Sequence, residues 1–413
     1  MAAPLPGFPE AAGLVYEYAS TLLLCPRRTE KIALESSAGR VLAEPQRADS
    51  DMPAFPRSTR DGFACRAQEA AHHHWLAVAG SIRAGDPPAA PLPPSSAWEI
   101  MTGAAVPYGA DAVAMLEHVE HSDGRIRLAS GRALEPGENV VPAAAEARAG
   151  DEIVPAGTRL GSSHIAAAAT CGYTALQVFA RPRVAILTTG DELVQVGATP
   201  GPGQIRNSNA PMLAALVTQA GGDPWVFPAA KDQPEAIESA LRQALDADLL
   251  LISGGVSAGK FDLVEPALAR LGARFRFTGV RIQPGKPLVF GELPRAANPL
   301  PFFGLPGNPI SSAATFLLFA AAVLRALAGV RQVAPHFSAA VVTREVKAKP
   351  NLTRFVPAST SCDPLGGSLP DVAPVHWHGS GDLAAFARAN CFLVVPEGAE
   401  RLAPGELARI LPL

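Results

Sequence analysis

Four short stretches of the chain together supply glycines, carboxylates and hydroxyls, a mixture that suits a phosphorylated ligand and a hard cation. They span residues 189–193, 231–232, 253–262 and 304–309. Small residues let backbone N–H groups approach an anion, whereas carboxylate oxygens are the ligands that Mg2+ prefers. In any single loop the glycines would serve as turns and the acids as helix caps. Four such loops favour a binding site, provided that the fold brings them together.

The elements that must position these stretches are predicted to form a doubly wound α/β unit. Apolar or β-branched runs at 184–189, 225–227, 249–252 and 301–305 are typical of strands, and helical segments alternate with them. Each of the four stretches follows one of these strands. Because ligands bind beyond the carboxyl ends of parallel strands, the four loops are expected to lie on one edge of the sheet.

Three helices are predicted inside this unit. One is expected to begin at Ser208 or Asn209, with Pro211 in its first turn. The pattern Asp232-x-x-Glu235 resembles a capping box that begins a second helix. The apolar stretch 313–324 is shorter than the roughly 20 residues of a membrane span, so a buried helix is expected there.

Outside this α/β unit, the pattern of predicted helices and strands is different. Helices are predicted at 9–24 and 163–170, with short alternating strands between them. The tail after residue 331 shows short strands and one helix at 382–390, which indicates a separate small β unit. A chain of 413 residues is too long for one hydrophobic core, so two to four folding units are expected.

Composition excludes several classes of protein. The net charge is −3 and 18% of residues are charged, which leaves no basic excess for a nucleic-acid partner. The five cysteines are odd in number and far apart, which disfavours disulfides and zinc. The loop 254–259 lacks the Walker ending, and no dinucleotide fingerprint follows the first strand. With no signal-peptide pattern, a cytoplasmic protein without membrane association is expected.

These motifs resemble, in chain order, those of the molybdopterin molybdenumtransferases, a family that includes bacterial MoeA and the E domain of gephyrin. Residues 52–64 are similar to the family's proline-rich Ser-x-x-Asp-Gly-Tyr-Ala segment, and residues 100–104 match its Met-Thr-Gly-Ala element. The resemblance spans nearly the whole chain. Its further segments are 107–111, 155–158, 189–193, 253–262, 284–287 and 305–309.

The resemblance implies a multidomain α/β plus β fold. Its doubly wound α/β molybdopterin-binding domain would be joined by a helical linking domain, a β-rich domain and a C-terminal β-barrel. The boundaries would be 1–48 with 148–182 for the linking domain, 49–147 for the β-rich domain, 183–330 for the α/β domain and 331–413 for the barrel. It also implies an L-shaped homodimer whose site lies between the α/β edge of one subunit and the β-rich domain of the other.

The activity that the resemblance implies is insertion of molybdate into adenylyl-molybdopterin, with release of AMP and a requirement for Mg2+. Possible protein partners are a molybdopterin adenylyltransferase and an apo-molybdoenzyme. The catalytic groups would be Asp61, Thr102, Glu192, Asp232 and Asp262, of which Glu192, Asp232 and Asp262 would hold the metal. Thr102 taken alone is equally compatible with a turn-capping hydroxyl.

Residues expected to bind the pterin or the anion come from the four loops and from the resemblance. Lys286, Ser311 and Ser380 would lie near molybdate, as a point charge and hydrogen-bond donors. The full cofactor-binding set is Thr189, Gly190, Asp191, Ser253, Gly254, Gly255, Ser257, Lys286, Pro306, Gly307, Asn308, Pro309, Ser311 and Ser380.

Several cations of the family pattern are absent from this sequence. Val141 and Gln283 stand where the family has Arg and Lys, Glu146 stands where it has Asp, and Leu352 and Pro357 stand at its arginine positions. A lost charge-assisted contact costs roughly 1.5–3 kcal/mol. The alternative function is therefore a catalytically impaired paralogue that binds or carries molybdopterin as a scaffold.

Two further possibilities stay open at this point. Arg354 or Arg281 lies close enough in sequence to compensate for a missing cation. A third and weaker interpretation is an adenylyltransferase that acts one step earlier on the same kind of α/β domain. Additional domains on both sides of the α/β unit disfavour it.

Overall fold

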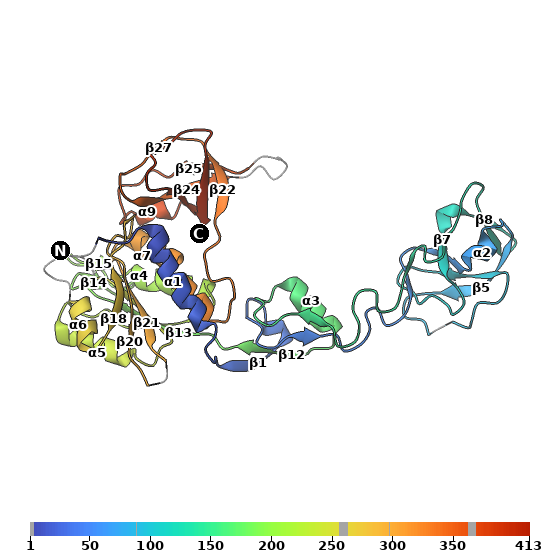
Figure 1. Ribbon diagram of the computed structural model, residues 1–413, viewed down its shortest axis with the longest axis horizontal. Helices are drawn as coiled ribbons and strands as arrows, with labels where there is room; N and C mark the ends of the chain where they lie inside the picture. Colours follow the sequence, from blue (N-terminus) through green and yellow to red (C-terminus); the bar gives the residue numbers. More distant parts are fainter. Residues whose placement is uncertain (1–3, 88, 256–262, 297, 362–368) are drawn as a thin grey trace.

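The molecule is elongated, with an α/β domain and a β-barrel at one end and a β-rich domain at the other (Figure 1). The computed structural model describes residues 4–87, 89–255, 263–296, 298–361 and 369–413. A small linking domain lies between the two ends. The multidomain α/β plus β architecture expected from the sequence is confirmed.

The α/β domain is built on a six-stranded sheet of order β16-β13-β17-β21-β20-β18. β13 pairs in parallel with β16 and β17, and β17 pairs in parallel with β21. The four predicted strands are therefore confirmed as parallel neighbours. β20 is antiparallel to both β21 and β18, and neither β18 nor β20 was expected. The strands are β13 (Arg183–Thr188), β16 (Asp223–Val226), β17 (Leu249–Ser253), β18 (Arg274–Thr278), β20 (Val289–Leu293) and β21 (Leu300–Leu305).

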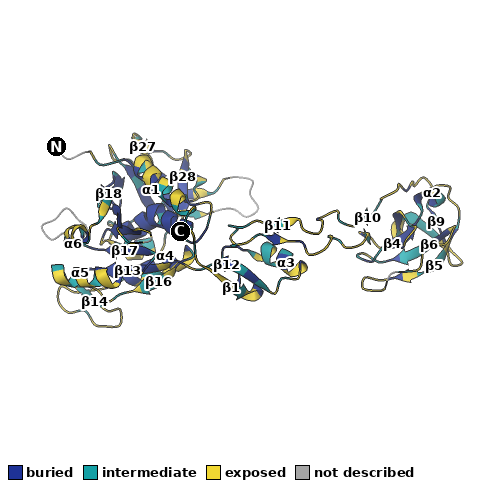
Figure 2. Cartoon of the chain, turned by 60° about the horizontal axis from the view of Figure 1, so that its bottom comes forward, coloured by how far each residue is buried: buried dark blue, intermediate teal, exposed yellow. Residues whose placement is uncertain are grey.

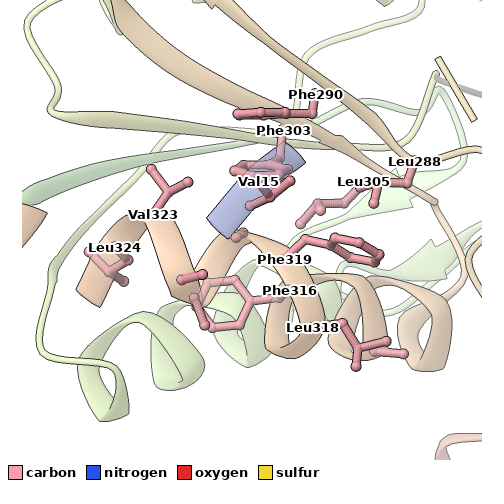
Figure 3. Close-up of a cluster of buried hydrophobic side chains, with 14 of the residues drawn as sticks. Val15, Leu288, Phe290, Phe303, Leu305, Phe316, Leu318, Phe319, Val323 and Leu324 are labelled. Carbon is pink, nitrogen blue, oxygen red and sulfur yellow. The ribbon is translucent and has the colours of Figure 1, made fainter. Parts of the chain in front are cut away.

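Helices cover both faces of this sheet, as doubly wound topology requires. One face carries α4 (Asn209–Gln219), α7 (Pro309–Thr315) and α8 (Ala321–Leu327), and their apolar side chains share one core with Ile186, Leu251 and Phe303. The opposite face carries α5 (Pro234–Gln243) and α6 (Val264–Arg270), which pack on Leu250 and Phe302. Figure 3 shows the first core, with Phe316 and Phe319 below Phe303.

Two expectations about helices have different outcomes. The capping box at Asp232 and Glu235 is wrong, because α5 begins at Pro234 with the extended residue Gln233 as its N-cap and no side-chain cap. Proline suits this first position since its missing N–H needs no partner there. The buried apolar helix is confirmed. The helix over residues 309–327 is long and apolar enough to cross a membrane, but 83% of its most apolar 18-residue stretch is buried inside the molecule.

The N-terminal helix α1 (Phe8–Leu22) packs on the α/β domain although its sequence neighbours belong to the linking domain. Ala11, Val15 and Ala19 are fully buried in the same core as α8. Phe8 makes edge-to-face contacts with Phe319 and with Phe355 of the barrel, at ring-centroid distances of 5.8 and 5.0 Å. The helix therefore joins two domains. The predicted domain boundaries themselves stay a prediction.

The linking domain consists of two small antiparallel sheets and α3 (Ser162–Thr170). β1 (Thr29–Ala33) pairs with β12 (Ala175–Phe179), and β2 (Gln46–Arg47) pairs with β11 (Glu152–Val154). From there two antiparallel segments run to the β-rich domain. They are held by the bridge between Met52 and Ala147 and by the pairing of β3 (Arg57–Ser58) with β10 (Val140–Val141). Figure 2 shows these crossing segments as largely exposed.

The β-rich domain at the far end contains a six-stranded sheet of order β7-β4-β6-β5-β9-β8. Its own apolar core includes Phe63, Leu76 and Ile126, so it is packed independently of the α/β domain. The strands are β4 (Gly62–Cys65), β5 (Leu76–Ile82), β6 (Ser96–Ile100), β7 (Ala112–Met115), β8 (Val119–Ser122) and β9 (Arg125–Leu128), with the short helix α2 (Ala67–Ala70).

The C-terminal strands close into a five-stranded barrel. β24 pairs with both β25 and β26, which closes the order β24-β25-β22-β28-β26. The short strand β19 (Ile282–Gln283) extends from the α/β domain and pairs in parallel with β24. The elements are β22 (Ser338–Val342), β24 (Thr353–Ser361), β25 (Asp371–Pro374), α9 (Leu383–Phe386), β26 (Cys391–Val395) and β28 (Leu407–Pro412).

Candidate functional site

A pocket of about 810 Å3 lies beyond the carboxyl ends of the parallel strands of the α/β sheet. Each of the four loops expected at this edge contributes described residues to the lining of the pocket. The residues expected from the sequence that line it are Thr189, Gly190, Glu192, Asp232, Ser253, Gly254, Gly255, Pro306, Gly307, Asn308 and Pro309. Ser257 and Asp262 lie outside the described residues. The loops expected at one edge of the sheet therefore surround one pocket.

Glycine is required where the loops meet. Gly254 has a φ of +101°, and a Cβ atom there would lie 2.6 Å from the carbonyl oxygen of Thr189. A Cβ on Gly307 would be 3.6 Å from the Cα of Gly254, so the loops after β17 and β21 are in backbone contact. A side chain at 254 would push the loop after β17 away from Thr189, which lies in the loop after β13. The glycines serve close packing at the pocket floor and leave backbone accessible to a ligand.

Asn209, at the start of α4, connects these loops and was not among the predicted binding residues. Its Nδ2 donates to the carbonyl oxygen of Gly307 at 2.6 Å and to the Oγ of Ser253 at 2.8 Å. Asn207 similarly donates to the Oγ1 of Thr188 at 2.8 Å. The only signal in the sequence was the predicted helix start at Ser208 or Asn209. That position was interpreted as a cap, not as a bridge between loops.

Arg206 also lines the pocket and was not predicted. It lies on β15 (Ile205–Arg206), which pairs in parallel with β14 (Leu193–Val194). Its Nε donates to the carbonyl oxygens of Val196 and Ala198 at 3.0 and 3.1 Å. These bonds hold the loop between β14 and β15 beside the pocket.

Carboxylates gather on one wall of the pocket. A Cβ on Gly190 would lie 2.7 Å from both carboxylate oxygens of Glu192, so this side chain folds back over the glycine. The N–H of Asp232 donates to the Oδ1 of Asp191 at 3.2 Å. Burial raises the pKa of the Asp232 carboxyl, and the negative charges of Asp191 and Glu192 raise it further. Such a wall attracts a cation.

A second pocket of about 550 Å3 adjoins the first one. Pro287, Pro306 and Asn308 line both pockets, so they form a shared wall. Lys286, Ser311 and Ser380, expected from the resemblance to lie near the anion, all line this second pocket together with Arg354 and Gln283. Ser380 is held against α7 because its carbonyl oxygen accepts from the N–H of Ile310 at 3.0 Å. The structure thus brings the expected anion residues together.

Asp61 and Thr102 lie in the β-rich domain, at the opposite end of the same chain (Figure 1). The N–H and hydroxyl of Thr102 both donate to the Oδ1 of Asp61, at 2.7 and 2.8 Å. These two bonds lower the pKa of the Asp61 carboxyl. Within one chain, this pair is not brought together with Glu192 or Asp232.

Comparison with known proteins bears on the whole chain. Three family models match consecutive stretches: the MoeA N-terminal region (domain I and II) at 9–172, a probable molybdopterin binding domain at 185–326 and the MoeA C-terminal region (domain IV) at 339–413. The chain is 34% identical to the molybdopterin molybdenumtransferase of a Nostoc species, covering 99% of this chain and 94% of that protein. The chain belongs to the MoeA family of molybdopterin molybdenumtransferases.

Further relatives agree with this assignment to the MoeA family. The molybdopterin molybdenumtransferase of Bacillus subtilis is 34% identical, over 93% of this chain and 89% of that protein. A crystal structure of the molybdopterin biosynthesis MoeA protein from Pyrococcus horikoshii is 26% identical, with a TM-score of 0.82 over 99% of this chain and all of that one. A second structure of MoeA from the same organism is 30% identical, with a TM-score of 0.73.

The positions where this chain departs from the MoeA pattern have defined surroundings. Val141 lies opposite Arg57 in the β3–β10 pair, and Arg57 forms an ion pair with Glu146 at 2.5 Å. Arg281 is already bonded, to Glu397 at 3.2 Å and to the carbonyl oxygen of Leu5 at 2.9 Å. Arg281 lines neither of the two pockets, in contrast to Arg354, which lines the second one.

The tail positions differ from one another. Pro357 is buried within the barrel, whereas Leu352 is half-buried just before β24. Phe355, the residue that keeps the MoeA pattern, is fully buried against Phe8. Arg354 lies between Leu352 and Phe355 and lines the second pocket. A cation is therefore present there, although not at the family's positions.

Proposed function

We propose that this chain acts in molybdenum cofactor biosynthesis by inserting molybdate into adenylyl-molybdopterin, with release of AMP. The observation that carries the proposal is the pair of adjoining pockets at the sheet edge. One is lined by glycines and carboxylates, the other by cations and hydroxyls, and they share Pro287, Pro306 and Asn308. A phosphorylated pterin in the first pocket would place its dithiolene beside an oxyanion in the second.

Backbone and side-chain donors of this chain would hold the pterin in the first pocket. Gly254 and Gly307 leave backbone exposed to the ligand, and Asn209 fixes the distance between their loops. In the second pocket, Lys286 would balance the charge of molybdate, while Ser311 and Ser380 would donate hydrogen bonds.

The donors on the acidic wall fit Mg2+. Glu192 and Asp232 carry hard carboxylate oxygens. The pKa of Asp232 is raised first by burial and then by the negative charges of Asp191 and Glu192, which a cation would offset. Among the residues that the structure describes, no three His, Cys, Asp or Glu side chains are grouped to hold a metal alone. Glu192 and Asp232, with Asp262, would hold Mg2+ together with substrate phosphates. The ion would supply positive charge against the phosphate oxygens during release of AMP.

A homodimer is part of this proposal. Asp61 precedes β4 and Thr102 follows β6 of the β-rich domain, which lies at the opposite end of the molecule from the α/β domain (Figure 1). In a dimer, the β-rich domain of one subunit would bring this pair to the α/β edge of the other. The lowered pKa of Asp61 keeps its carboxylate ionised for that role. We further expect a cytoplasmic protein that receives its substrate from an adenylyltransferase and passes its product to an apo-molybdoenzyme.

The test is a reconstitution assay with the full chain. Purified protein is mixed with adenylylated molybdopterin, molybdate and Mg2+, and both AMP release and activation of an apo-molybdoenzyme are measured. Omission of molybdate or of Mg2+ is the matched control. We expect activation that depends on both. Binding of the pterin without any molybdate-dependent activation would defeat the proposal.

The scaffold alternative is not favoured. Relatives that match nearly the full chain at 34% identity are named molybdopterin molybdenumtransferases. The second pocket also carries Lys286 and Arg354 despite the departures from the family pattern. The adenylyltransferase alternative is likewise disfavoured, because the family models on both sides of the α/β domain are those of MoeA.

A further inference from the structure

We propose that Arg354 is a second oxyanion-binding cation of this chain, placed one strand away from the neutral Gln283. This inference rests on the proposed function, because it concerns the pocket assigned above to molybdate. It assigns the residue that sets oxyanion affinity in this particular sequence.

Strand pairing places Arg354 beside Gln283. β19 and β24 are parallel, and Gln283 is the register partner of Arg354. Side chains at paired positions of neighbouring strands project to the same face of a sheet. Both residues line the same pocket of about 550 Å3, together with Lys286, Ser311 and Ser380. The positive charge of Arg354 therefore lies in the same pocket that a positive charge at position 283 would face.

The polar atoms of this pair lack partners. The Nε of Arg354 and the Oε1 of Gln283 are both buried, and neither has a hydrogen-bond partner within the described part of the chain. Arg354 is anchored because its Nη1 donates to the carbonyl oxygen of Lys347. A buried N–H group without a partner is costly, since burial removes its water and supplies nothing in exchange. An anion in the pocket would accept a hydrogen bond from the Nε of Arg354, whereas the Oε1 of Gln283 is itself an acceptor and needs a donor.

The charge state supports the same conclusion. Burial lowers the pKa of Arg354, which shows that the folded protein disfavours its charge in the absence of a counter-ion. The ion pairs found among the described residues include Arg281 with Glu397 and Arg57 with Glu146, but none involves Arg354. Arginine presents a planar fork that contacts two oxygens of one oxyanion, whereas Lys286 acts as a point charge. Together they suit a tetrahedral dianion such as molybdate.

The first experiment measures molybdate binding to the full chain by calorimetry, in the wild type and in Arg354→Gln. We expect the substitution to weaken molybdate affinity about tenfold or more, because a charge-assisted contact is lost. Affinity for the pterin should be unchanged, which also shows that the variant is folded. Arg281→Gln is the matched control: the Nε of this neighbouring arginine also lacks a partner, but Arg281 pairs with Glu397 and lines neither pocket, so molybdate affinity should be unchanged.

The second experiment is a charge swap. The double variant Gln283→Lys with Arg354→Gln returns one positive charge to the same space from the paired position. We expect it to recover most of the molybdate affinity that Arg354→Gln loses, and Arg354→Lys to keep part of it. Titrations with tungstate and sulfate report whether the arginine also sets oxyanion preference.

The outcomes separate this inference from the function it rests on. A wild type that binds molybdate and turns over, with an unchanged affinity in Arg354→Gln, overturns the role of Arg354 alone. An equal loss of pterin and molybdate affinity in that variant overturns it too, because the residue is then structural. A wild type that binds no molybdate and shows no turnover overturns the proposed function and this inference with it.

Discussion

Asp232 is the residue whose surroundings most directly predict a pH dependence. Its carboxyl pKa is raised, first by burial and then by the charges of Asp191 and Glu192. The ionised form is therefore disfavoured in the folded protein. Because the pKa of Asp232 is higher in the folded than in the unfolded protein, the protonated carboxyl favours the folded state. This contribution to the free energy of unfolding is fully present below the unfolded-state pKa and is lost as the pH rises through the folded-state pKa. At neutral pH, the ionised Asp232 therefore lowers the free energy of unfolding.

Asp232→Asn should raise the melting temperature at pH 7, because it removes this unfavourable charge. The difference should shrink toward pH 3.5, where the wild-type carboxyl is also protonated. The same variant should bind Mg2+ more weakly, since a metal-binding carboxylate is gone. Thermal unfolding at both pH values, with a calorimetric titration of Mg2+ binding, provides the measurement. Equal melting temperatures at pH 7 would contradict the assigned pKa shift.

The glycines and acids that line the first pocket could be predicted from the sequence because they directly follow predicted strands. Parallel strands then bring these loops to one edge of the sheet. Lys286, Ser311 and Ser380 come from distant segments and were found by resemblance. Asn209 was missed as a binding residue because its role depends on hydrogen bonds to Ser253 and Gly307, which are far away in sequence, so no local pattern reveals it.

The helix 309–327 contains an irregular element with a partner far away in sequence. Between α7 and α8, the segment η3 (Phe316–Ala320) adopts π-helical geometry. The hydroxyl of Tyr16, on α1, donates to the carbonyl oxygen of Leu318 at 3.0 Å. Burial raises the pKa of Tyr16 to about 12, so the hydroxyl remains a donor at all physiological pH values. π-helical turns leave backbone groups that need outside partners, and Tyr16 supplies one.

Tyr16→Phe should therefore lower the free energy of unfolding by about 1–3 kcal/mol, because the carbonyl of Leu318 loses a partner in a partly buried place. Tyr18→Phe is the control on the same helix. Its hydroxyl makes no hydrogen bond within the described residues, so its loss should cost less. Urea denaturation of both variants tests the difference. A cost for Tyr18→Phe equal to that for Tyr16→Phe would argue against the bond to Leu318.

Elements were predicted best where periodicity alone decides them. The four parallel strands and the buried helix follow from apolar runs. β18 was missed because its Arg-Phe-Arg-Phe-Thr sequence places charges on an edge strand, which resembles an exposed loop. The packing of α1 on the α/β domain could not be predicted. The apolar face of a helix indicates that the helix will be buried, but not which domain will cover it.

The length of the molecule leads to a prediction about subunit pairing. Asp61 and Asp232 lie at opposite ends of one chain, so the proposed site needs two subunits (Figure 1). Asp61→Asn and Asp232→Asn should each abolish turnover when pure. Mixed and allowed to exchange subunits, they should regain about a quarter of wild-type activity, because half of the dimers are mixed and each has one intact site.

The control for this mixing experiment is Asp61→Asn mixed with Thr102→Ala, since both changes lie in the same half of the site. A mixed dimer of these variants has no intact site, and no activity should return. Recovery in the control, or none in the first mixture, would contradict a site shared between subunits.

The path of the chain through α1 limits how this protein can be divided. Residues 8–22 complete the α/β core, yet the chain then leaves for the linking and β-rich domains and returns only at β13. A fragment cut at residues 183–330 would display bare apolar surface where Val15 and Ala19 belong, and would tend to aggregate. A soluble pterin-binding unit needs the first helix reattached ahead of β13. Engineering or evolutionary transfer of this unit must therefore carry two separated pieces of the gene.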